Sequence, residues 1–175
     1  MDEAMRAAVQ TLLDKDAIRE IIYRYCHAND RRNWEMLKTL YHEDGTDDHG
    51  RFKGLASDFA EYAASRQSSE LEITYHTVGS IAIELDGDSA KAESYMTCYH
   101  LFRSDDGGPL FDFMGARLVD RFERRQGTWA IADRVLVRDW RHRVRLEEPE
   151  GADEFVRGRV DEDDMAWGMF FAGRT

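Results

Sequence analysis

The chain has 175 residues, of which 42% are hydrophobic and 34% charged, and its formal net charge at pH 7 is −11. This length and composition are typical of one globular domain with a buried core. The acidic balance argues against nucleic acid or an anionic membrane as a partner, because both attract basic proteins. No apolar run could span a bilayer and the N-terminus shows no signal peptide, so we expect a cytoplasmic protein.

The first 42 residues have a helical pattern. Ile18, Ile21, Ile22 and Tyr25 recur at helical spacing and form one apolar face, with Asp14 or Asp16 as a possible N-cap.

A second, shorter helix is predicted after Asn33, which is a suitable N-cap. This helix carries Trp34, Leu37, Leu40 and Tyr41, and we expect Gly45 to end it. Residues 56–66 predict a further helix.

From Leu71 onward the pattern becomes that of β-strands. Turn signals at 86–88, 105–109 and 126–127 separate four long runs, at about 71–85, 89–104, 110–125 and 128–145. Helices followed by antiparallel strands indicate an α+β fold. We expect helices packed on a strongly curved, mostly antiparallel sheet that forms a cone-like α+β barrel with an internal cavity.

We expect residues 1–145 to form this barrel domain and residues 146–175 to belong to it as an acidic connection and an aromatic tail. The tail, 165–171, either closes the pocket of its own chain or packs against a neighbouring subunit.

Motifs for common cofactors are absent: the sequence has no GxGxxG, GxxxxGK[ST], HExxH, GxSxG or CxxC. We therefore predict no cofactor. Cys26 and Cys98 are interpreted as buried reduced thiols, with a catalytic thiol or a disulfide as the less favoured alternatives.

One short segment, 41–49, is rich in residue types that bind divalent metals. Its residues match no fixed metal-ligand spacing, so we favour the end of a helix followed by a short strand with its polar side in solvent. The residues concerned are His42, Asp44, Asp47, Asp48 and His49.

Asp30 and His76 are the strongest catalytic candidates. Asp30 closes the first helical segment, and His76 lies in the strand-like run 73–78. An imidazole titrates near pH ~6.5 and can act as a base, while a carboxylate fixes its tautomer and stabilises the imidazolium.

Several motifs, taken in order, resemble the SnoaL-like branch of the nuclear transport factor 2 superfamily over about residues 10–143. They are Ile18-Arg-Glu-Ile-x-x-x-Tyr25-x-x-x-x-Asp30, Trp34, Tyr41-His-x-Asp-Gly, Thr74-x-His76-Thr and Gly127-x-Trp129-x-Ile131 leading to Arg138. The resemblance implies a curved sheet packed by helices and assembly as a dimer or trimer.

Bile acid 7α-dehydratase, scytalone dehydratase and hexachlorocyclohexane dehydrochlorinase types of this family resemble the chain in an Asp–His pair. The bile acid type also resembles it in a Tyr and an Arg. The resemblance thus implies Tyr25, Asp30, His76 and Arg138 as catalytic residues.

The assignment of Arg138 to the cavity requires a break in the strand pattern. Trp129 and Arg138 have opposite parity, so both face inward only if a bulge or twist lies between them. Arg134 and Arg141 are the alternatives for the catalytic arginine.

Together these features predict a cofactor-free lyase for a hydrophobic, ring-bearing, hydroxylated small molecule, as in the catabolism of aromatic compounds. Dehydration and formaldehyde-releasing cleavage of a lignin-derived diarylpropane are both open, and so is an isomerase or cyclase. A non-catalytic binding protein or oxygenase small subunit is the alternative class. We expect the substrate to be contacted by His49, Tyr99, His100 and Trp140.

Overall fold

The computed structural model describes residues 1–66, 71–104, 107–147 and 154–170. Its helices are α1 (Glu3–Asp30), α2 (Trp34–Thr39), α3 (Ala56–Arg66) and α4 (Trp167–Phe170). Its strands are β1 (Tyr41–Asp48), β2 (Lys53–Leu55), β3 (Leu71–Asp86), β4 (Ser89–Arg103), β5 (Pro109–Arg125) and β6 (Thr128–Arg145).

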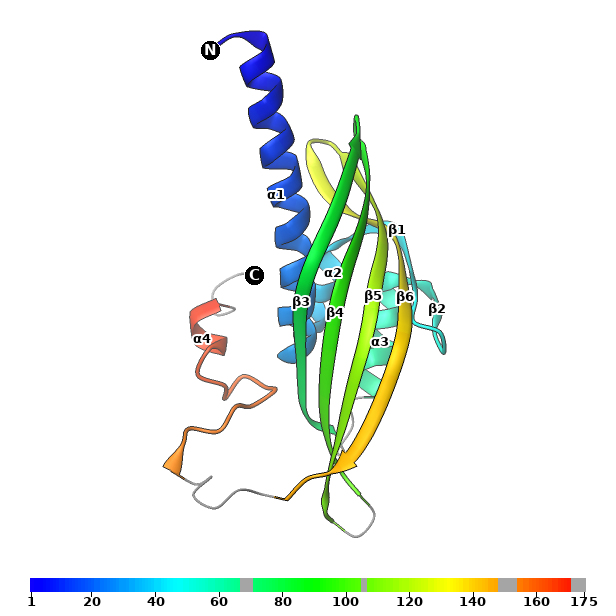
Figure 1. The fold of residues 1–175 in the computed structure, drawn as a ribbon, viewed down its shortest axis with the longest axis vertical. Coiled ribbons are helices and arrows are strands. Elements are labelled where there is room, and N and C mark those ends of the chain that lie inside the picture. Colours follow the sequence, from blue (N-terminus) through cyan, green and yellow to red (C-terminus); the bar gives the residue numbers. More distant parts are fainter. Residues whose placement is uncertain (67–70, 105–106, 148–153, 171–175) are drawn as a thin grey trace.

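The six strands form one sheet in the order β2-β1-β6-β5-β4-β3. All neighbouring pairs are antiparallel except β1 and β6, which run parallel. Figure 1 shows α2 and α3 behind this sheet and α1 running alongside β3. The predicted α+β class, the four long strands and the helix at 56–66 are confirmed, but the sheet stays open, with β2 and β3 at its edges.

The first helix is longer than predicted. It begins after Asp2, whose side chain accepts a hydrogen bond from Met5 N at 2.8 Å, so neither Asp14 nor Asp16 is a cap. Asp14 is buried and accepts hydrogen bonds from Trp129 Nε1 at 2.9 Å and Arg124 Nη1 at 2.8 Å. It joins α1 to the β5–β6 hairpin, a long-range role that its local sequence does not reveal.

The second helix begins at Asn33 as predicted but ends before Gly45. The Asn33 side chain accepts a hydrogen bond from Met36 N, and the helix stops at Thr39. Gly45 instead lies inside β1, where a Cβ would come within 2.9 Å of the backbone oxygens of His42 and Ile131. Glycine is needed here because β1 approaches β6 closely at an irregularity in their register.

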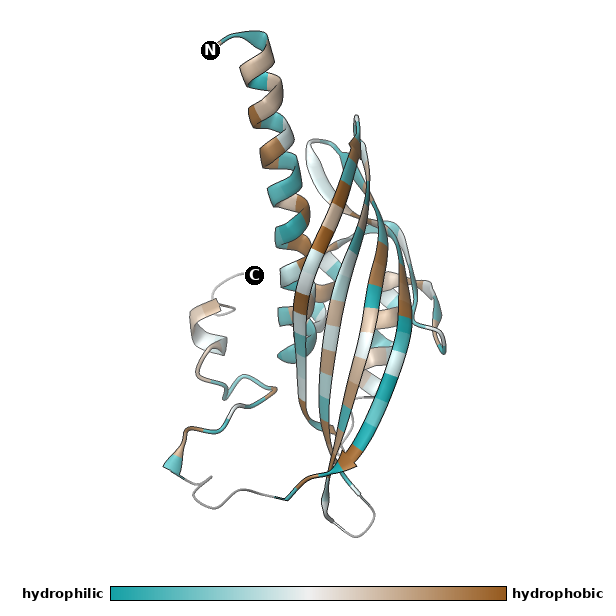
Figure 2. Ribbon diagram, viewed as in Figure 1, coloured by the Kyte–Doolittle hydropathy of each residue, from teal (hydrophilic) through white to brown (hydrophobic). Residues whose placement is uncertain are grey.

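The core lies between the helices and the concave face of the sheet. Its fully buried side chains include Ile18 and Ile22 of α1, Leu118 and Phe122 of β5, and Ile131 of β6. Figure 2 shows hydrophobic and hydrophilic residues alternating along the strands, as expected when one face is covered and the other is not. Among the described residues, no helix is both long enough and apolar enough to cross a membrane.

Candidate active site

The end of α1 meets the edge strand β3 at Asp30 and His76. Asp30 Oδ1 lies 2.6 Å from His76 Nδ1, and Asp30 Oδ2 accepts a hydrogen bond from the His76 backbone N at 3.0 Å. Each side chain is 11% exposed. One carboxylate therefore fixes both the strand position and the ring of His76, and Nε2 is the ring nitrogen that Asp30 does not occupy.

The pKa of His76 reflects this pairing. Burial alone would lower the pKa, but hydrogen bonds to Asp30 and Cys98 outweigh burial and raise it from 6.5 to about 10. The resting state at neutral pH is therefore an imidazolium paired with a carboxylate. His76 must release this proton before it can act as a base.

A second imidazole, His100, faces His76 from the adjacent strand. The ring centroids are 6.0 Å apart. Burial and the charge of His76 lower the pKa of His100 to about 4, although Asp112 opposes this effect. The site thus contains one cationic and one neutral imidazole, and the neutral His100 can accept a hydrogen bond from a substrate hydroxyl.

Deeper in the core, Tyr25 belongs to a second polar cluster. Its hydroxyl lies 3.2 Å from His49 Nε2, and His49 Nδ1 contacts Asp47 Oδ1. The other Asp47 oxygen accepts a hydrogen bond from Tyr41 at 2.5 Å. His49 and Asp47 thus form a second imidazole–carboxylate pair, which the sequence analysis did not anticipate.

Arg134 supports this cluster from β6. Its side chain is fully buried and forms two hydrogen bonds of 2.7 Å with Asp120, and its guanidinium lies 4.0 Å from the Tyr25 ring centroid. Burial acts to lower the pKa of Arg134, but Asp120 and its other neighbours raise it well above the usual value, so it remains charged.

Cys26 lies within electrostatic reach of both clusters. Burial raises the pKa of its thiol to about 12, with Arg134 lowering the pKa and Asp30 and Cys98 raising it. Both cysteines are buried and free. They match the interpretation as reduced thiols, and Cys98 additionally contacts the candidate base.

Arg138 is placed on the inner face by a bulge in β6. Ile131 pairs with Phe122 and Asp133 pairs with Arg121, so one additional residue of β6 lies between them and reverses the parity of the strand. Arg138 then pairs with the inward-facing Ala116, but its side chain is exposed. No contact recorded among the described residues joins it to Asp30 or His76.

A pocket of about 350 Å³ opens between α1 and β3. It is lined by Asp30, His76 and Cys26, but not by Tyr25, His100 or Arg138. His27 and Arg31 belong to the same wall. The C-terminal segment packs against these two residues: Phe170 makes an edge contact with His27 at 5.3 Å, and Asp164 lies 3.4 Å from Arg31. The described part of the tail therefore lies beside the pocket of its own chain.

Most of the acidic and histidine residues of 41–49 have protein partners. His42 Nε2 lies 2.9 Å from the backbone oxygen of Glu123, Asp44 pairs with Arg125, and Asp48 pairs with Lys53. Of the predicted cluster, only Asp47 and His49 contact each other. Within the ranges that the structure describes, no three metal-binding side chains converge on one point.

The sequence matches the model of the SnoaL-like domain over residues 10–135. The chain belongs to the SnoaL-like family. No curated protein matches the sequence.

Solved structures share the fold of this SnoaL-like protein at low identity. A putative scytalone dehydratase from Novosphingobium aromaticivorans is 19% identical, with a TM-score of 0.68 over 82% of this chain and 97% of the other. A hexachlorocyclohexane dehydrochlorinase from Novosphingobium barchaimii is 14% identical, with a TM-score of 0.70 over 81% and 99%. A protein of unknown function from Nostoc punctiforme is 19% identical, with a TM-score of 0.60 over 73% and 92%.

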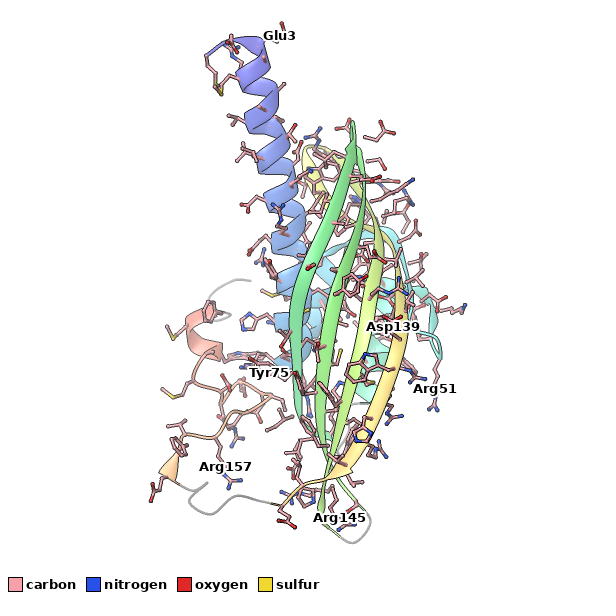
Figure 3. All side chains as sticks on the ribbon, in the orientation of Figure 1. Glu3, Arg51, Tyr75, Asp139, Arg145 and Arg157 are labelled. Atoms are coloured by element: carbon pink, nitrogen blue, oxygen red, sulfur yellow. The ribbon has the colours of Figure 1, made fainter. Side chains whose placement is uncertain are left out.

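Two of the predicted substrate contacts, Tyr99 and Trp140, lie away from the site of this SnoaL-like protein. Tyr99 stacks on Phe113 at 5.0 Å, and Phe113 makes an edge contact with Trp140, which is 46% exposed. These rings occupy the outer face of the sheet, and Figure 3 labels Tyr75, which contacts Tyr99 at 6.1 Å.

A bulge in β3 explains the position of His76. Ile81 pairs with Ser94, but Val78 pairs with Met96, so the register shifts by one residue between them. The additional residue lies in β3 and exchanges its two faces, so His76 pairs with Cys98 on the inner face. Strand β4 has no bulge: Cys98 and His100 continue the inward alternation of Ser94 and Met96, and Tyr99 faces outward.

Proposed function

We propose that the protein is a cofactor-independent lyase that acts on a hydrophobic, ring-bearing, hydroxylated small molecule. The observation that carries this proposal is the pair of hydrogen bonds that the Asp30 carboxylate accepts from the ring and the backbone N–H of His76. A structural histidine needs one partner, whereas a base needs a fixed tautomer, a fixed ring plane and an available second nitrogen. Family membership supports the proposal, because relatives of the same fold are named as a dehydratase and a dehydrochlorinase.

In the proposed reaction, neutral His76 removes a proton from an acidified carbon or a hydroxyl of the substrate through Nε2. Asp30 stabilises the imidazolium that forms. The leaving hydroxyl takes a proton from Tyr25 as the C–O bond breaks, so the products are an alkene and water. Positioned acids and bases each contribute typically ~10² to 10⁴-fold.

The developing negative charge on the substrate requires a cation. Arg138 on the inner face is the proposed residue for this, and Arg134 contributes through the Tyr25 ring. The neutral His100 accepts a hydrogen bond from the substrate.

Two outcomes of the same chemistry are proposed, namely dehydration and release of formaldehyde from a hydroxymethyl side chain. In the second, His76 removes the proton of the hydroxymethyl hydroxyl, the C–C bond breaks to release formaldehyde, and the carbon that keeps the electron pair takes the proton of Tyr25. Lignin-derived diarylpropane diols carry the groups that each outcome needs.

Mass spectrometry of the purified protein with hydroxylated substrates tests the proposal. The substrates are diarylpropane diols, β-hydroxy ketones of steroid type and polyketide-like alcohols, with no cofactor added. His76→Gln is the test variant, and His142→Gln is its control because His142 is an exposed histidine on β6.

Loss of water or of formaldehyde that requires His76 but not His142 supports the lyase. Tight binding without conversion in all three proteins contradicts it and favours a binding or scaffold role.

A further inference from the structure

The hydroxyl of Tyr25 has one proton, and the groups around it determine which acceptor receives its hydrogen bond. The phenol is 2% exposed. Burial and the charge of Asp47 raise its pKa well above 10, although Arg134 lowers it, so the phenol is protonated at neutral pH. Its hydroxyl lies 3.2 Å from His49 Nε2.

Asp47 determines which nitrogen of His49 carries hydrogen. The buried carboxylate uses one oxygen to accept a hydrogen bond from Tyr41 and the other to contact His49 Nδ1. Nδ1 therefore carries a proton. In neutral His49 the remaining nitrogen, Nε2, has only a lone pair, and the hydroxyl of Tyr25 must donate to it.

We propose that His49 is a positioning residue that controls the proton of Tyr25, so that Tyr25 acts as an acid only while His49 is protonated. This inference rests on the role of Tyr25 in the proposed function. With His49 neutral, the proton of Tyr25 is held by Nε2. With His49 protonated, Nε2–H donates to the phenol oxygen, and the proton of Tyr25 is free to reach the leaving group.

The proton balance of one turnover is complete. As the C–O bond of the substrate breaks, Tyr25 gives its proton to the departing hydroxyl and water forms. The proton on His49 Nε2 then moves to the phenolate oxygen. The Arg134 guanidinium over the ring stabilises the transient phenolate charge. His49 recovers a proton from solvent, and His76 releases to solvent the proton that it took from the substrate.

His49 and Tyr25 differ in their exposure to solvent. The His49 side chain is 18% exposed, whereas Tyr25 is almost completely buried. Phe59 of α3 stacks on the His49 ring at 4.3 Å and 28°, which holds the ring plane toward Tyr25. His49 is therefore the more accessible partner, through which Tyr25 exchanges protons with solvent.

The groups that face His49 come from each element packed around it. Asp47 and Tyr41 lie on β1, and the neighbouring Asp48 is within electrostatic range. Tyr25 lies on α1, and Phe59 on α3 is uncharged. Arg134 on β6 is paired with Asp120.

Nuclear magnetic resonance of the whole protein tests this coupling without any substrate. The ¹⁵N shifts of His49 report its tautomer and titration, and the ¹³Cζ shift of Tyr25 reports its hydrogen bond. We expect the Tyr25 signal to change with pH in step with the ¹⁵N shifts of His49. His49→Gln should abolish that change, because the amide donates at every pH.

His42→Gln is the matched control, since His42 lies on β1, which ends just before His49, and its ring contacts a backbone oxygen of Glu123. Tyr25→Phe provides a second test that keeps the ring: it should shift the titration of His49. A Tyr25 signal that does not respond while His49 titrates overturns the proposal, and so does an unchanged response in His49→Gln.

Turnover gives an independent measurement once a substrate is found. His49→Gln should lower kcat by roughly 10²-fold with KM nearly unchanged, and it should remove the alkaline limb of the pH profile. An unchanged kcat and pH profile overturns the role. If the wild type converts no substrate while the resonances remain coupled, the proposed lyase function fails and the control of the Tyr25 proton by His49 stands.

Discussion

The carboxylate of Asp30 holds His76 by two hydrogen bonds, one to the imidazole Nδ1 at 2.6 Å and one to the backbone N at 3.0 Å. The helix end thereby fixes both the edge strand and the ring it carries. The second hydrogen bond makes the orientation of the ring a property of the backbone. Replacing Asp30 should therefore affect chemistry and local packing separately.

Asp30→Asn should lower kcat by roughly 10²- to 10⁴-fold, because the amide cannot stabilise the imidazolium. Its carbonyl oxygen can still accept from one of the two nitrogens, so the fold should survive. The pKa of His76 should fall toward 6.5, because the remaining effect of burial lowers it. A ¹⁵N titration and a pH–rate profile measure both effects, and a His76 titration unchanged from the wild type would contradict the assignment.

In His49→Gln, in which Tyr25 no longer depends on the proton of His49, kcat/KM should rise with pH from neutral toward about 10, because only neutral His76 can act as a base and its pKa is raised to about 10. The acid limb of kcat/KM reports this titration in the free enzyme. A limb near 6.5 would show that Asp30 does not hold the proton on His76. A limb absent from the profile would exclude His76 as the base.

The same pKa predicts that stability decreases as pH rises. The folded protein retains the proton on His76 up to about 10, whereas the unfolded chain releases it near 6.5. The contribution is fully present below the unfolded pKa and is lost as pH rises toward the folded value, by at most ~1.4 kcal/mol per pH unit. His100 has the opposite effect: because its pKa is lowered to about 4 in the folded protein, its neutral form is favoured, and stability is lost as pH falls from about 6.5 toward about 4.

Urea unfolding between pH 7 and about 8.5 isolates this effect. Above that range the unfolded chain also ionises Cys26, whose folded pKa is about 12. The free energy of unfolding should fall with pH in the wild type and be nearly flat in His76→Gln. Equal slopes in the two proteins would contradict the raised pKa of His76.

Local signals in the sequence predicted much of the fold. Alternating apolar residues and three turn signals are sufficient to place β3 to β6, since both depend only on neighbouring residues. Asp14 shows the limit of such signals: as a polar residue before an apolar stretch it resembles a cap, and only its bonds to Trp129 and Arg124 reveal its role.

The site was predictable only in part, because side-chain faces depend on register. Sequence spacing does not bring Asp30 to His76, and the family resemblance supplied that pair. Tyr99 was expected to contact the substrate, but it follows the unbroken alternation of β4 and faces outward, whereas an additional residue in β3 places His76 opposite Cys98. The corresponding bulge in β6 was recognised as a requirement for Arg138 and is present. Bulges of one residue leave little trace in hydrophobic periodicity, yet they exchange the two faces of a strand.

Gly45→Ala should destabilise the fold by about 1–3 kcal/mol, because the new Cβ meets two backbone oxygens within 2.9 Å and neither belongs to a flexible side chain. Gly79→Ala is the control. It lies in β3, where a Cβ meets nothing closer than 3.7 Å, so its effect should stay within about 0.5 kcal/mol. Chemical denaturation compares the two, and equal effects would exclude the close approach of β1 to β6.

Replacing Arg134 should mainly lower the free energy of unfolding, whereas replacing Arg138 should mainly lower turnover. Arg134→Met leaves Asp120 charged and fully buried, and should destabilise the protein by about 3–5 kcal/mol. Arg138→Met removes an exposed side chain and should change stability by less than about 0.5 kcal/mol, while lowering kcat if Arg138 stabilises the charge on the substrate. Unfolding curves and turnover of both variants separate structure from chemistry.

The double variant Asp120→Leu with Arg134→Met removes both charges together and should recover most of the lost stability. If the double variant remains as unstable as Arg134→Met alone, the loss comes from the cation–π contact with Tyr25 and not from the unpaired carboxylate.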